Sequence, residues 1–258
     1  MTLLLITLLM HGPGNEALTV QILSNGQFHE RLGAVHQLNA QLSPQQIARL
    51  CQYLQQPGEQ LGDAVLKNDL INTLRAQDQA AHELVPALLT IYNNPKHGEL
   101  MRDYAVQHLT ECYGWSREKD AILTALNQAT GETGSSIAGT ALLGLERIGD
   151  QTVRDKTAAQ ALNAAMQTTA SELTRIAAVR ICGRLSHQPA LSLVRDMVQN
   201  EGNISLRMAA IATLGELGDS TDLPLLLDLK NGLDSARLIP AAQRAVQLIE
   251  NAHGRKIL

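Results

Sequence analysis

Aromatic side chains are scarce in this chain, where one Phe, one Trp and four Tyr make up 2% of the 258 residues. Proteins that stack the bases of single-stranded nucleic acids need such rings, so the sequence does not predict a stacking platform. Soluble β-sandwiches are rich in aromatic and β-branched residues, and this composition argues against that fold as well. The core must therefore be built from aliphatic side chains.

A large excess of either charge is also missing. The chain carries 21 Lys and Arg residues against 25 Asp and Glu residues, which gives a formal net charge of −4. Proteins that bind the phosphate backbone of nucleic acids usually present a strongly basic surface. We therefore expect no nucleic acid among the partners of this chain.

Cysteine is rare too, with Cys51, Cys112 and Cys182 spaced 61 and 70 residues apart. An odd number at such wide spacing does not predict a disulfide framework, and the sequence has no C-x-x-C motif. Each cysteine lies among apolar residues with helical spacing, which is typical of a buried structural thiol.

Long hydrophobic runs are absent, since the longest covers residues 3–10, well below the roughly 20 residues that span a bilayer. This length suits the apolar part of a secretion signal, but no Lys or Arg precedes it and no clean A-x-A site follows. We interpret residues 1–26 as an apolar N-terminal segment, either the remnant of a signal or a cap on the first repeat. An exported (periplasmic) and a cytoplasmic location both remain open.

Leu and Ala are abundant instead, with 43 and 32 copies that together make up about 29% of the chain. Both are strong helix formers, so the composition favours a protein of closely packed helices.

The sequence contains internal repeats. The segment RMAAIATLGELGD at 207–219 resembles RIAAVRICGRLSH at 175–187, and more distant copies lie at 137–150 and 102–114. The last apolar positions of successive copies are 36, 37, 32 and 32 residues apart, which suits two helices and two turns per repeat. An alanine recurs at an equivalent position in the middle of each copy, where we expect neighbouring helices to stack closely. These residues are Ala105, Ala141, Ala178, Ala210 and Ala242.

Each repeat combines two helical patterns. In one copy, Leu206, Ala210, Leu214 and Leu217 follow the spacing of a helix with a single apolar face. A second pattern lies between the copies, as in SPQQIARLCQYLQQ from Ser43 to Gln56, which opens with a typical N-cap and N1 proline. No linker divides the chain. We therefore predict about six helical hairpins in a single domain that covers residues 27–258.

The two patterns resemble those of HEAT repeats, particularly the short HEAT-like type. Arg207 to Asp219 follows the family's R-x-A-A…L-G-x-L-G-D pattern, and Pro224 to Leu227 follows that of the partner helix. The resemblance is good over about residues 98–250 and weaker over 27–95. It implies an all-α fold, a right-handed α-α superhelix (solenoid) in which the R-x-A-A helix lines the concave face. The most frequent role in that family is to hold a protein partner in the concave groove.

Enzymes on a similar scaffold are the alternative. Iron-binding hydroxylases of this type carry repeated His-Glu pairs, and this chain has His29-Glu30 and His82-Glu83. The pairs are 53 residues apart, which is not a whole number of repeats, and they fall on different helix types. We therefore predict no metal site and no cofactor. HEAT-like DNA glycosylases need a basic face that this chain lacks, and no motif selects the HEAT-like bilin lyases.

The sequence thus favours a monomeric, non-catalytic scaffold that binds a protein partner, with an enzyme or enzyme accessory as the alternative. Unusual polarity within the helices and the clustering of aromatic residues near the sole Trp indicate where a partner would bind. A second interpretation is that these side chains form a ladder between repeats, with Asp69 paired to Arg102 and the asparagines capping turns, and the sequence favours this interpretation. The candidate residues are Asn68, Asp69, Asn72, Arg102, Asp103, Tyr104, Gln107, Trp115, Arg147, Arg180 and Arg184.

Overall fold

The computed structural model describes residues 21–38, 41–58, 62–77, 81–149, 151–231 and 236–254. Within these ranges the chain forms helices and turns, without a β-strand, as the sequence predicts. From α4 onward, the chain runs through six successive pairs of helices. Most of the predicted apolar segment at 1–26 lies outside the described residues.

The chain divides into two compact units, Met1–Ala125 and Leu126–Leu258. Each unit is a layered stack of helices, and helix α8 (Lys119–Ala129) contains the junction between them. A single domain over 27–258 stays a prediction.

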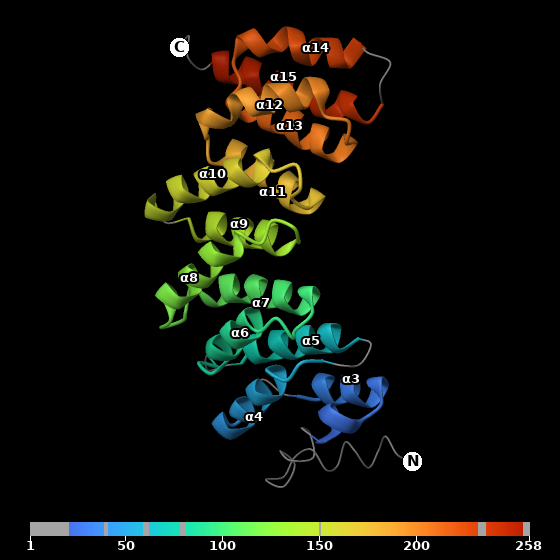
Figure 1. Cartoon of the computed structure of the whole chain (residues 1–258), viewed down its shortest axis with the longest axis vertical. Coiled ribbons are helices and arrows are strands. Elements are labelled where there is room, and N and C mark those ends of the chain that lie inside the picture. The colour runs from blue at the N-terminus through green and yellow to red at the C-terminus, as the bar shows by residue number, and fades with distance from the viewer. Residues whose placement is uncertain are drawn as a thin grey trace. The chain divides into compact units, whose positions relative to one another are not determined.

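The first unit has two layers of helices (Figure 1). Helices α3, α5 and α7 follow one another in one layer, and α4 and α6 form the other. The start of α4 confirms the predicted N-cap, because the Ser43 hydroxyl accepts a hydrogen bond from the Gln46 backbone N–H at 3.2 Å. The bounds are α3 Phe28–His36, α4 Pro44–Leu54, α5 Asp63–Arg75, α6 Leu84–Asn93 and α7 Glu99–Cys112.

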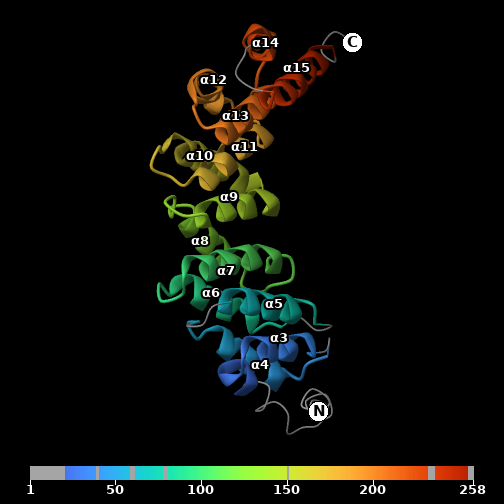
Figure 2. The same ribbon diagram turned by 90° about the vertical axis from the view of Figure 1, so that its right-hand side faces the viewer.

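The second unit repeats this arrangement more regularly. Helices α9, α11, α13 and α15 pack side by side in one layer, while α10, α12 and α14 each pack against the helix that follows them. Figures 1 and 2 show α12 beside α13 and α14 beside α15. The bounds are α9 Ile137–Ile148, α10 Gln151–Met166, α11 Glu172–Arg184, α12 Leu191–Asn200, α13 Ile204–Leu217, α14 Leu223–Asn231 and α15 Leu238–Gly254.

Small residues let the helices of successive repeats approach closely. The five predicted alanines, from Ala105 to Ala242, are all completely buried, which confirms that part of the repeat alignment. Gly215 of α13 lies so close to α15 that an added Cβ would come within 2.7 Å of the Ala245 Cα and 2.9 Å of its Cβ. Here the backbones of two repeats meet without room for another methyl group.

Substituting Gly215 with alanine should therefore destabilise the second unit. A methyl group forced against backbone atoms costs about 1–3 kcal/mol, so the midpoint of urea or thermal unfolding should fall. The matched control is Gly33→Ala in α3, where an added Cβ meets no atom within 4 Å. This control should leave stability unchanged or raise it by about 0.5–1 kcal/mol. Equal effects of the two substitutions would contradict the close approach of α13 and α15.

Candidate functional site

The candidate residues of the first unit lie on α5, on α7 and in the turn after α7. One of them joins a bridge between the two helices, since the Asn68 Oδ1 is 2.9 Å from the His108 Nε2. On the other side of this imidazole, the Arg75 guanidinium lies 3.2 Å from Nδ1 and also donates to the Glu111 carboxylate at 3.1 Å. A guanidinium can only donate, so Nδ1 accepts and Nε2 carries the hydrogen that is donated to Asn68.

His108 is buried and neutral in this bridge. Burial and, to a smaller extent, the positive charge of Arg75 lower its pKa to about 4, while Glu111 opposes the shift. Asn68 therefore bridges α5 and α7, a role that the second interpretation of the sequence does not give it, because there the asparagines cap turns.

The other candidates in this unit have different surroundings. The Arg102 Nε donates to the Tyr92 carbonyl of α6 at 2.8 Å, and its guanidinium lies over the Tyr92 ring at 5.3 Å. The Trp115 ring packs edge-on against His82, with 6.2 Å between the ring centroids. The predicted pairing of Arg102 with Asp69 stays a prediction. The remaining candidates differ in exposure. Asp69, Asp103 and Tyr104 are partly buried, and Asn72 and Gln107 are exposed.

In the second unit, side chains spaced four residues apart on α9, α11, α13 and α15 point away from the core. We call this set the outer stripe. Residues four apart share one face of a helix, and equivalent members on successive helices are 37, 32 and 32 residues apart. All of its members are exposed or partly exposed. They are Leu143 and Arg147 on α9; Ile176, Arg180 and Arg184 on α11; Met208, Ala212 and Glu216 on α13; and Pro240, Arg244 and Leu248 on α15.

Two of the predicted arginines are held in place on the outer stripe. Arg184 donates to both oxygens of the Glu146 carboxylate, at 2.5 and 2.6 Å, and this pair connects α11 to α9. Arg180 donates to Glu216 at 2.8 Å and thereby connects α11 to α13. Both arginines remain partly accessible, with 38% and 27% of the Arg184 and Arg180 side chains exposed. Bridging between repeats and exposure on the surface therefore occur together at these residues.

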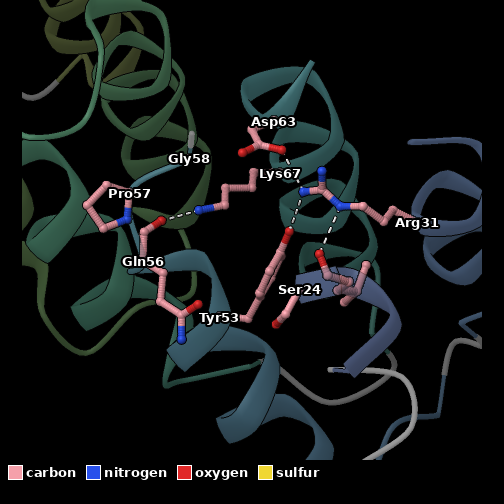
Figure 3. Close-up of a pocket in the computed structure, with 9 residues that line it drawn as sticks. Ser24, Arg31, Tyr53, Gln56, Pro57, Gly58, Asp63 and Lys67 are labelled. Carbon is pink, nitrogen blue, oxygen red and sulfur yellow. Dashed lines mark hydrogen bonds and ion pairs between the residues drawn. The ribbon is translucent and has the colours of Figure 1, made fainter. Parts of the chain in front are cut away.

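The sequence analysis missed a buried cluster of charges in the first unit. The Arg31 guanidinium donates to the Asp63 carboxylate at 2.6 Å and to the Tyr53 hydroxyl at 2.9 Å (Figure 3). Beside them, the Lys67 ammonium lies 5.1 Å from the centre of the Tyr53 ring. These residues line a cavity of about 350 Å³, although Arg31 and Lys67 are each only 2% exposed.

The Lys67 ammonium caps the end of α4. It donates to the backbone carbonyls of Leu54 and Gln56, while the His97 Nε2 lies 3.2 Å from the carbonyl of Gln55. A cation at the C-terminus of a helix compensates for the helix dipole and the unpaired carbonyls. Burial nevertheless lowers the pKa of Lys67 to about 8, an effect that Asp63 opposes and Arg31 increases.

Helical spacing contains a signal for these buried charges. Lys67 precedes Leu70 and Ile71 by three and four residues, and both are completely buried. Arg31 has the same relation to Ala34 and Val35, which are also buried. Each charge thus lies on the apolar face of its helix, where a charged side chain is rare without a partner.

In the described part of the chain, no group of three or more His, Cys, Asp or Glu side chains is arranged so that it could hold a metal ion. Among the helices described there, none has the length and apolarity to cross a lipid bilayer.

The buried His108 predicts a specific pH dependence of stability. Between pH 6.5 and about 4, the unfolded chain binds a proton at this histidine that the folded chain does not bind. Stability from this residue is therefore complete above pH 6.5 and is lost as the pH falls toward 4. In His108→Gln, the slope of unfolding free energy against pH should decrease by up to about one proton.

Urea unfolding at a series of pH values measures this slope. The control is His36→Gln, because His36 is exposed on the surface of α3. The same decrease in both variants, or no decrease in His108→Gln, would show that His108 is not neutral in the folded chain.

Comparison with known proteins supports the repeat assignment. The family model for HEAT repeats matches residues 159–246, from the middle of α10 into α15. No curated protein is similar enough to the chain to count as a match. The matched segment covers the α11 and α13 copies, whose R-x-A-A pattern carries the resemblance, together with their partner helices. Residues 159–246, which lie in the second unit, thus match HEAT repeats, in agreement with the resemblance of the α11 and α13 copies.

Proposed function

We propose that this protein is a non-catalytic scaffold that binds a protein partner along the outer stripe of its second unit. HEAT repeats commonly serve as scaffolds for protein interactions. One observation carries the proposal: at equivalent positions of successive repeats, the outer stripe exposes apolar side chains between arginines.

The composition of the outer stripe resembles that of protein interfaces. Leu143, Met208 and Leu248 are 44%, 38% and 37% exposed, one on each of three helices. Met and Arg are enriched in interfaces relative to the rest of protein surfaces. Because Glu146 and Glu216 hold Arg184 and Arg180 in place, these arginines lose less conformational entropy when a partner binds.

The charge of this surface favours an acidic partner. The outer stripe carries four arginines and the carboxylate of Glu216, with Glu146 paired beside it. The surface is therefore locally positive on a chain whose formal net charge is −4. Complementary charge guides the encounter of two proteins and adds specificity. The expected partner is a segment with acidic and apolar side chains.

The chemistry of the outer stripe supports binding rather than catalysis. Its polar groups are guanidinium groups and a carboxylate, and a guanidinium stays protonated at any pH that a protein tolerates. General acid–base catalysis needs a group whose pKa lies near the working pH. The layer that carries the outer stripe consists of R-x-A-A helices, which line the concave face in HEAT repeats. The candidates on α5 and α7 form a separate proposed contact region in the first unit.

Affinity capture from the native cell, followed by mass spectrometry, tests whether the partner binds the outer stripe when matched variants are compared. In the double variant Met208→Ser and Leu248→Ser, partner recovery should fall at least about tenfold, since two exposed apolar contacts are lost. The control is Met166→Ser and Leu227→Ser, which changes apolar side chains that are 52% and 41% exposed on α10 and α14. Far-UV circular dichroism should show unchanged helicity in both variants.

The control distinguishes binding at the outer stripe from nonspecific binding through exposed apolar side chains elsewhere. A partner that is retained by the control and lost by the outer-stripe variant supports the proposal. Equal recovery of the partner with both variants, or its loss with the control alone, would show that the partner does not bind the outer stripe.

A further inference from the structure

We propose that the cavity beside Lys67 in the first unit binds a carboxylate ligand with a single negative charge, anchored by the Lys67 ammonium. This site is separate from the outer stripe and does not depend on it. It rests on the geometry of the cavity, the unused hydrogen-bonding capacity of Lys67 and the charge balance of the cluster.

Side chains from several helices converge on the cavity. Arg31 comes from α3, Tyr53 from α4, and Asp63 and Lys67 from the first two turns of α5 (Figure 3). The cavity of about 350 Å³ lies within the size range of pockets that hold small molecules, roughly 300–1,000 Å³. The exposed Pro57 also lines it and offers apolar surface for a short hydrocarbon chain.

Lys67 has a donor to spare in this cavity. An ammonium group carries three N–H donors, and the backbone carbonyls of Leu54 and Gln56 accept two of them. The side chain is almost completely withdrawn from solvent, so water compensates little for the third donor. A ligand oxygen in the cavity would complete its coordination.

Among the residues that the structure describes, the cluster carries one positive charge in excess. Arg31 and Lys67 contribute two positive charges, and Asp63 contributes one negative charge that is already paired with Arg31. A ligand with one negative charge neutralises this excess, because it meets Lys67 while Asp63 stays engaged. A doubly charged phosphate would leave a negative charge uncompensated beside the Asp63 carboxylate. The charge balance therefore favours a monocarboxylate over a phosphate group.

The neighbouring groups define how binding depends on pH. The groups facing Lys67 are Asp63 on its own helix, Arg31 and Tyr53 on α3 and α4, and His97 in the turn before α7. A carboxylate prefers the protonated ammonium, so affinity is greatest below the pKa of about 8 and decreases as the pH rises above it. By linkage, a bound carboxylate raises the pKa of Lys67.

Nuclear magnetic resonance on the full, isotopically labelled chain tests this inference with butyrate as the probe. The Lys67 side-chain resonances should titrate near pH 8 without butyrate and at higher pH with it, and butyrate should bind saturably. Butyramide, which has the same shape without the charge, should cause no shift. A similar response to butyramide, tighter binding of inorganic phosphate or no saturable response to butyrate would overturn the proposal.

Variants at Lys67 test the anchoring group. Lys67→Met should weaken butyrate binding by at least about tenfold, because it removes a charged donor. Lys156→Met on the exposed surface of α10 is the control and should bind as the unchanged chain does. Since Lys67 also caps α4, Lys67→Arg provides a variant that keeps the charge, and it should retain part of the affinity. Full binding by a folded Lys67→Met chain would contradict the proposal.

The source of the carboxylate is distinguished by a peptide. A tripeptide with a free C-terminus is compared with butyrate and with the amidated form of the same peptide. Stronger binding of butyrate indicates a small-molecule ligand, and stronger binding of the free peptide indicates the end of a partner chain. Both results support the carboxylate site, whereas equal binding of the free and amidated peptides contradicts it.

Discussion

The helices of this chain bury their apolar faces against helices of neighbouring repeats, and residues without bulky side chains let equivalent helices approach closely. Completely buried alanines recur along the repeats, and at Gly215 the α13 and α15 backbones leave no room for a Cβ. This close approach brings side chains about one repeat apart within hydrogen-bonding distance. The Thr213 hydroxyl thus donates to the Val179 carbonyl at 3.0 Å, and that of Thr174 donates to the Ser135 carbonyl at 2.7 Å. Apolar packing and polar bridges therefore depend on the same spacing.

The same constraint separates the stability of the second unit from its recognition surface. Positions such as Ala178 and Ala210 face the core and are fixed by packing, while Arg180 and Ala212, two residues further on, point outward. Stacked repeats gain stability mainly from the interfaces between neighbours, so their outward positions are free to vary. The pairs of Arg180 with Glu216 and of Arg184 with Glu146 use this freedom. As partly exposed ion pairs they add modest stability, and they also fix two arginines in defined orientations.

The sequence predicted the repeat architecture because spacing alone carries that information. Apolar periodicity gave α4 and α13 within a few residues of their observed bounds. Helix α10 was not among the helices identified, because its buried residues are Thr157 and four alanines, which follow helical spacing but are too small to form a distinct apolar pattern in the sequence. The hydrogen bond between Asn68 and His108 could not be predicted, because that contact depends on how α5 and α7 are aligned along their length.

Arg31 and Lys67 show why the cavity of the first unit was not predicted, although each residue lies on an apolar helix face. Periodicity gives the direction of a side chain, but the residues that pair with it come from other helices, as Tyr53 does for both. Burying these charges costs free energy, and well-packed apolar residues of similar volume are often equally stabilising. Part of that cost is offset by the Asp63 carboxylate and by the carbonyls at the end of α4. Both charges thus have structural partners, and Lys67 in addition lies beside a cavity. The carboxylate ligand proposed above would give its ammonium an anionic partner, which the helix end alone does not supply.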